Sequence, residues 1–75
     1  MFKTTKYIVD GMNIKNAKII RNSLYVLNEI IDVSIDIERH ELKIKYANSL
    51  KVKDLNINVK FLEEITDVKV RNIYI

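Results

Sequence analysis

The 75-residue chain contains no cysteine, no proline and a single glycine. The lack of cysteine excludes disulfide bonds and every metal site built from thiolates, and it leaves the redox compartment open. The lack of proline removes the residue that most often interrupts a helix. The one glycine, Gly11, therefore marks the place where backbone angles closed to other residues are available, and we expect a turn there.

Long apolar runs are also missing. No run approaches the roughly 20 residues that span a bilayer, and Met1–Lys6 lacks the apolar core of a secretory leader, so we expect a soluble cytoplasmic protein without a membrane segment. The net charge of +3 is mildly basic and does not by itself indicate nucleic acid. Because 48% of the residues are hydrophobic, residues 1–75 have enough core material to fold as one domain.

The groups that catalysis requires are missing as well. The chain has no cysteine nucleophile, no histidine with a convincing partner and no glycine-rich phosphate loop, and Asp32, Asp36 and Glu38 fall on an outward strand face. We therefore expect neither an enzyme nor a small-molecule substrate, and the sequence implies no cofactor.

Hydrophobic periodicity predicts the secondary structure. Strands are predicted over residues 2–9, with Tyr7 and Val9 inward, and over 31–38, 42–46 and 67–75. Helices are predicted over residues 15–28, with Asn13 as N-cap, and over 52–64, with Asn48 or Ser49 as N-cap. A turn centred on Arg39 and His40 joins the second and third strands and sets Asp36 opposite Lys43. The inward phase of the second strand comprises Ile31, Val33, Ile35 and Ile37.

The predicted order β-α-β-β-α-β belongs to the α+β class. With right-handed crossovers it gives a ferredoxin-like sandwich, a four-stranded antiparallel sheet with two helices on one face. One contiguous core is expected from Leu24, Val33, Ile35, Ile37, Leu42, Ile44 and Leu62.

The turn Gly11-Met12-Asn13-Ile14-Lys15-Asn16-Ala17 resembles the signature loop of the heavy-metal-associated (HMA) domain of copper chaperones and copper- or zinc-transporting P-type ATPases. That loop reads Gly-Met-x-Cys-x-x-Cys, and Ile14 and Ala17 stand at the cysteine positions. The resemblance extends from about Lys6 to Val70 in element order and length. It implies a divergent member in a metal-transport context, with no metal expected at positions 14 and 17 and with Met12 packed in the core.

A binding surface is the function that remains. Lys15, Lys18 and Arg21 follow the loop, and in copper chaperones a similar lysine-rich helix face docks the acidic surface of a partner domain. The resemblance places Ile14 in solvent, as an apolar contact between Asn13 and these basic residues. We therefore expect a protein-interaction or docking module whose partner presents acidic residues. The opposing interpretation is that Ile14 folds back onto the core and the lysines only aid solubility.

Two other functions stay open. The first is weak metal binding through Met12, His40 and a carboxylate such as Asp10 or Glu41, with a partner chain supplying a further ligand. The second, more remote, is RNA binding, because the RNA-recognition motif shares this element order. That motif stacks bases on outward aromatic residues of its first and third strands. Here Lys43 and Lys45 are predicted to point outward and Tyr46 inward, so nucleic acid is not expected.

Overall fold

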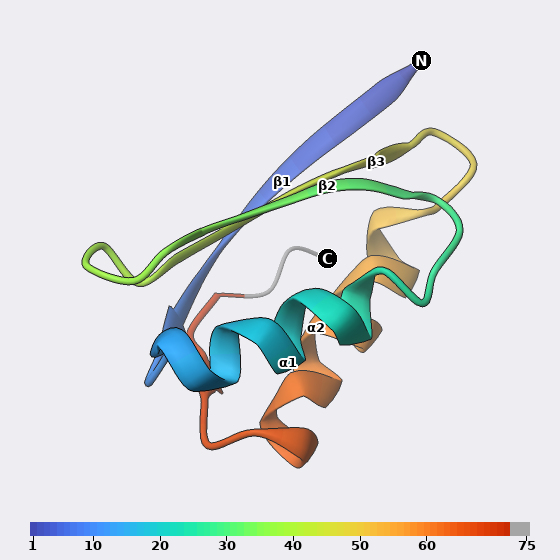
Figure 1. The fold of residues 1–75 in the computed structure, drawn as a ribbon. Coiled ribbons are helices and arrows are strands. Elements are labelled where there is room, and N and C mark those ends of the chain that lie inside the picture. Colours follow the sequence, from blue (N-terminus) through green and yellow to red (C-terminus); the bar gives the residue numbers. More distant parts are fainter. Residues whose placement is uncertain (73–75) are drawn as a thin grey trace.

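A computed structural model describes residues 1–72 and shows a four-stranded sheet with two helices on one face (Figure 1). The elements are β1 (Phe2–Asp10), α1 (Ile14–Leu24), β2 (Ile30–Asp36), β3 (Glu41–Ala47), α2 (Val52–Ile65) and β4 (Lys69–Val70). Their order and antiparallel pairing confirm the predicted ferredoxin-like sandwich. The last part of the predicted C-terminal strand, residues 73–75, lies outside the described residues.

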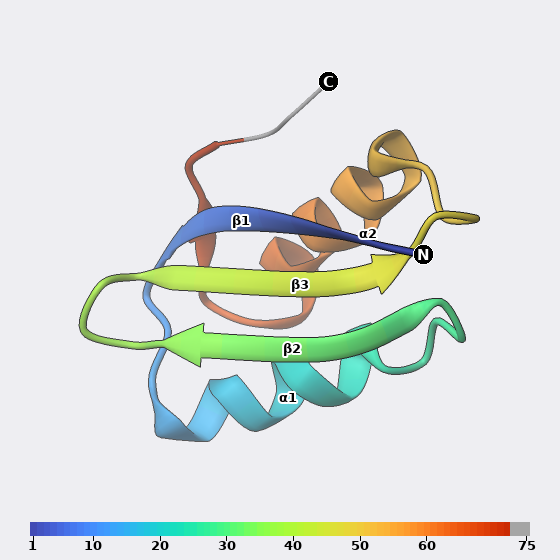
Figure 2. The ribbon, with the colours of Figure 1, turned by 90° about the horizontal axis from the view of Figure 1, so that it is seen from above.

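The strands lie in the order β2-β3-β1-β4, so β3 and β1 are the central strands and β2 and β4 are the edges. Figure 2 shows α1 on the β2 side of the sheet and α2 on the β1 side. β4 pairs with the end of β1 through Val9 opposite Val70 and Asp10 opposite Lys69. This pairing brings the last described residues to the same end of the sandwich as the turn that precedes α1.

The core lies between the sheet and the helices. Tyr7 and Val9 point inward as predicted, and so does Tyr46. The Tyr7 hydroxyl donates to the side-chain oxygen of the buried Asn56, which ties β1 to α2 and satisfies a polar group that burial would otherwise penalise. The buried apolar residues are Tyr7, Val9, Met12, Ile20, Leu24, Ile30, Val33, Leu42, Ile44, Tyr46, Leu50, Leu55, Val59, Leu62, Val68 and Val70.

The predicted inward phase of β2 is wrong at both of its ends. The register with β3 shifts between Ile30 and Asp32, so Ile30 is buried and Ile31 is exposed. A bulge of this kind inserts one extra residue and turns the following side chains over, which a strict period of two does not anticipate. At the other end the strand stops at Asp36, so Ile37 lies in the turn, and Ile35 is only partly buried against the core.

The predicted hairpin register is also wrong. Lys43 pairs with Ser34, and Asp36 pairs with Glu41. The reason is a four-residue turn, Ile37–His40, in which His40 takes a left-handed conformation with φ of 58° and its N–H donates to the Ile37 carbonyl. The Asp36 carboxylate accepts from the backbone N–H of Arg39, so it stabilises the turn rather than a cross-strand charge pair.

Both helices form, and two details of their ends differ from the prediction. α1 ends at Leu24, four residues before Asn28, because the chain turns there and Leu27 and Ile30 donate to the carbonyls of Leu24 and Leu27. α2 has Lys51 as its N-cap, without a side-chain hydrogen bond, since Asn48 and Ser49 lie in the preceding turn. Within residues 1–72, no helix is long and apolar enough to cross a membrane.

The outer edge of β2 is covered by side chains of α1 and the residue after it. The Arg21 guanidinium donates to the Val33 carbonyl at 3.1 Å, and the Val33 N–H donates to the Tyr25 hydroxyl at 3.1 Å. An uncovered edge strand offers these groups to another chain. Arg21 and Tyr25 therefore both dock α1 against β2 and block strand addition at its midpoint.

Glu63, near the end of α2, covers the outer edge of β4 in the same way. Its carboxylate accepts from the Val70 N–H at 2.7 Å and lies 3.1 Å from the Lys60 ammonium. The hydrogen bond from Val70, followed by that from Lys60, lowers the pKa of Glu63. The short strand β4 is thus held on one side by β1 and on the other by a helix side chain.

We predict that Ile44→Ala destabilises the protein by about 2–5 kcal/mol and that Ile35→Ala costs clearly less. Ile44 is fully buried at the centre of the sheet, whereas Ile35 is only partly buried. Urea denaturation followed by circular dichroism measures both variants against the native chain. Equal losses for the two variants would show that the core is centred elsewhere.

Candidate functional site

The turn between β1 and α1 depends on a close approach of two backbone segments. Gly11 has φ of 92°, a conformation that residues with a Cβ rarely adopt. A Cβ at this position would lie 2.7 Å from the carbonyl oxygen of Asp67, in the segment between α2 and β4. The absence of a side chain therefore lets the first turn and the last connection pack against each other.

The start of α1 is fixed by two asparagines. The Asn13 side chain accepts from the Asn16 N–H at 2.8 Å, and the Asn16 side chain accepts from the Asn13 N–H at 2.7 Å. This reciprocal capping box confirms Asn13 as the N-cap. The buried Asn16 also donates to the Gly11 carbonyl at 2.9 Å, so one amide holds the turn from within. Asn16 was not predicted, although an asparagine three residues after an N-cap asparagine is a recognisable signal.

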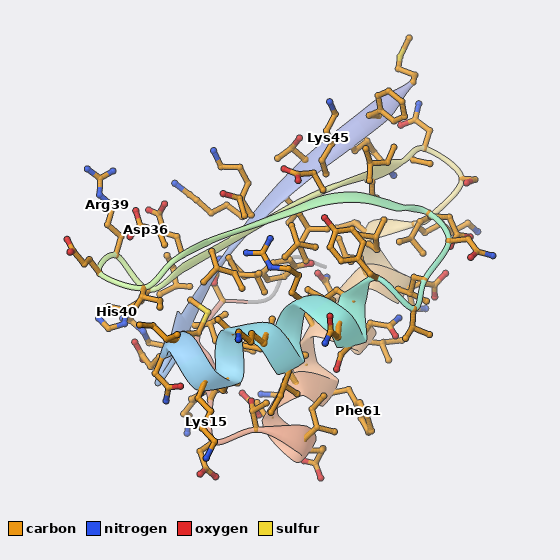
Figure 3. All side chains as sticks on the ribbon, viewed as in Figure 1. Lys15, Asp36, Arg39, His40, Lys45 and Phe61 are labelled. Carbon is orange, nitrogen blue, oxygen red and sulfur yellow. The ribbon has the colours of Figure 1, made fainter. Side chains whose placement is uncertain are left out.

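The surface predicted for docking lies on this rigid turn. Ile14 is the first residue of α1 and is 78% exposed, so the expectation that it projects into solvent is confirmed and the fold-back onto the core is wrong. Asn13, Lys15 and Lys18 are exposed beside it. Figure 3 shows Lys15 projecting from the N-terminal end of α1. Arg21 is exposed too, but its hydrogen bond to Val33 gives it a role in the fold.

A hollow of about 440 Å³ adjoins the surface. It lies between the first turns of α1 and the last turn of α2, and it is lined by Asn13, Lys15, Asn16, Ile19, Glu63, Glu64, Ile65, Thr66 and Asp67. The first turn of α1 contains no acidic residue. Lys15 therefore lines the same hollow as three carboxylates, those of Glu63, Glu64 and Asp67.

The two weak metal candidates lie in different environments. Met12 is 6% exposed and packs in the core, as the resemblance implies. His40 lies in the exposed hairpin turn, at the same end as the Gly11 turn (Figure 3). Its Nδ1 is 3.9 Å from Asp10 Oδ1, but Asp10 Oδ2 is 2.6 Å from Arg71 Nε. Glu41 pairs instead with Lys6.

The donor chemistry for a metal is correspondingly poor. The side chains of Ile14 and Ala17 are hydrocarbon, so the loop positions that carry cysteine in the resemblance offer no ligand. Across residues 1–72, no group of three or more His, Cys, Asp or Glu side chains is arranged to hold a metal ion. The residues present therefore do not fit a metal held by this chain alone.

Comparison with solved structures gives strong matches over almost the whole chain. An HMA domain of the copper chaperone for superoxide dismutase, in its apo form, matches with a TM-score of 0.72 and 12% identity over 97% of this chain and 70% of that one. A putative copper-ion-binding protein from Bacillus anthracis matches with a TM-score of 0.75 and 16% identity over 95% and 97% of the two chains. The chain has the fold of an HMA domain.

A third match, the NMR solution structure of a ZiaAN sub mutant, has a TM-score of 0.67 and 18% identity over 93% of this chain and 96% of that one. No protein-family model and no curated protein matches the sequence. The HMA resemblance predicted from Gly11-Met12 is thus confirmed for the fold, while the cysteine ligands are absent from this sequence.

We predict that Gly11→Ala destabilises the HMA fold by more than about 1 kcal/mol, the central value for single substitutions. The alanine must either adopt a strained positive φ or push Asp67 away. Ala17→Gly, six residues on, is the control for a small change in the same segment, and it costs about 1 kcal/mol through helix propensity. Thermal denaturation measures both. A Gly11→Ala variant as stable as the native chain contradicts the close packing of the turn.

Proposed function

We propose that this chain is a protein-docking module built on the HMA fold, in a metal-transport context. Its contact surface comprises Asn13, Ile14, Lys15 and Lys18, with Arg21 at the margin. The observation that carries the proposal is the 78% exposure of Ile14 on a turn that hydrogen bonds hold rigid. The copper chaperone among the structural matches supplies the context.

Ile14 is suited to be the centre of a contact. Burying an isoleucine side chain against a partner contributes about 1.5–3 kcal/mol, and a large apolar residue in a fixed position needs little ordering when it binds. The capping box and the Asn16 amide provide that fixed position. Stability does not explain an isoleucine here, because a solvent-exposed β-branched residue contributes little to a helix.

The basic residues around Ile14 determine the kind of partner. Lys15 and Lys18 form a polar rim, and rim charges act chiefly on the rate of association and on the choice of partner. A partner with acidic residues around an apolar depression fits this surface. Salt should weaken the complex, because exposed charges are screened.

Metal binding without thiols is the alternative function. Its support is the pair His40 and Asp10, which lie close enough to share a cation if Arg71 releases the carboxylate. Two ligands hold zinc only weakly, so a partner chain must supply the rest. RNA binding has less support, because Tyr46 of β3 is buried and Lys43 and Lys45 occupy the outer face where bases would stack.

The docking role predicts site-specific crosslinking. A photoreactive amino acid at position 14, in cells that produce the chain, should capture one specific protein. The same group at Ser34, an exposed residue on the far face of the sheet, should not capture it. Capture of the same protein from both positions, or of none from position 14, contradicts the proposal.

With the captured protein purified, titration calorimetry measures the contribution of each residue. Ile14→Ser and the pair Lys15→Glu with Lys18→Glu should each weaken binding at least about tenfold. Lys51→Glu with Lys53→Glu is the matched charge control, because both lysines are exposed at the start of α2. A loss as large for this control pair would mean that overall charge, not this surface, determines binding.

We predict that the native chain binds Cu(I) weakly and that Ile14→Cys with Ala17→Cys creates tight binding. Positions 14 and 17 lie one turn apart at the start of α1, where the helix N-terminus favours a thiolate. Competition with a chromophoric Cu(I) chelator measures both proteins, and circular dichroism checks the fold. Zn(II) titration of the native chain and of His40→Ala tests the alternative function. Tight metal binding by the native chain would overturn the docking proposal in favour of metal handling.

A further inference from the structure

An apolar ridge runs along the solvent side of α2. It comprises Ile57, Phe61 and Ile65, which are 62%, 58% and 39% exposed. Residues four apart lie on one row of a helix surface, so the three side chains form a continuous ridge. Figure 3 shows Phe61 on the helix side of the molecule and Lys45 on the opposite face of the sheet. The α2 ridge is therefore separate from the sheet surface.

An open hollow of about 440 Å³ lies beside this ridge. It is lined by Ile57, Asn58, Lys60, Phe61, Glu63 and Glu64. A protruding aromatic side chain next to a hollow is the arrangement in which an anchor of one molecule enters a recess of another. Because one helix supplies both the anchor and the recess, the surface is able to match a copy of itself.

We propose that the α2 ridge binds a second copy of this chain, with the two α2 helices antiparallel and crossing at Phe61 on a two-fold axis. The pattern is symmetric about that residue, since one isoleucine lies four positions before it and another four positions after it. The axis therefore places Ile57 of one copy against Ile65 of the other. Rows of residues four apart pack into each other at a crossing angle of about 50°, the commonest class in globular proteins.

The charges beside the ridge agree with this arrangement. Lys60 and Glu64 lie on the same flank, on opposite sides of Phe61 in the sequence. The two-fold axis therefore brings Lys60 of each copy next to Glu64 of the other. Within residues 1–72, Lys60 pairs with Glu63, whereas Glu64 is exposed and takes part in no ion pair. A second copy places a Lys60 ammonium beside the Glu64 carboxylate at two symmetric positions. A partner that presents acidic residues there would repel Glu64.

The first experiment is sedimentation equilibrium of the full chain over a range of concentrations reaching millimolar. The native chain should show a monomer–dimer equilibrium, and Phe61→Ser should raise its dissociation constant at least about 25-fold. Phe2→Ser is the matched control, because Phe2 is exposed to a similar degree on β1. A native chain that stays monomeric, or a Phe61→Ser variant that associates like the native chain, overturns the proposal.

The second experiment uses the absence of cysteine, which makes engineered disulfides unambiguous. Under diamide oxidation, Phe61→Cys should crosslink to itself. Ile57→Cys and Ile65→Cys should crosslink when mixed and far less when alone, and Ser34→Cys, on the opposite face of the sheet, should give the background. Equal crosslinking of Ile57→Cys alone and in the mixture contradicts the antiparallel two-fold arrangement. None of these results depends on the docking role of Ile14.

Discussion

The close approach of Gly11 to the Asp67 carbonyl is the constraint on which the geometry of this end of the molecule depends. It lets the turn before α1 pack against the connection before β4, and β4 then pairs with the end of β1. The Asn16 amide donates to the Gly11 carbonyl, and the Glu63 carboxylate accepts from the Val70 N–H, so α1 holds the turn and α2 holds β4. The position of Ile14 in solvent follows from this arrangement rather than from its own contacts.

The periodic features of the sequence were sufficient to predict the elements, their order and the inward phases of β1 and β3, because those features follow directly from burial on one face. The errors lie where the backbone departs from regular geometry. The bulge at Ile31 and the turn that contains the left-handed His40 each shift the register, and the turn depends on local hydrogen bonds such as that from the Arg39 N–H to Asp36. Hydrophobic pattern carries no information about such bonds.

The candidate site was predictable to a similar extent. The capping by Asn13 follows from its place at the start of a helix, and the exposure of Ile14 was implied by the HMA resemblance; both agree with the structure. Arg21 was assigned to the surface because it follows Lys15 and Lys18 along the first helix. Its hydrogen bond to Val33 could not be predicted, because β2 becomes an edge strand beside α1 only in the tertiary structure. The burial of Asn16 could not be predicted for the same reason, because it depends on how the turn packs over the side chain.

The contacts that hold the turn also explain how the HMA fold persists without sulfur. Gly11 packs through its backbone, Asn13 and Asn16 bond through amides, and Met12 fills the core, so none of these interactions uses the side chains at positions 14 and 17. Ligand residues are therefore separable from the frame that positions them. Because the fold does not require an exposed isoleucine at position 14, the docking role that we propose gives this residue a physical reason to be there.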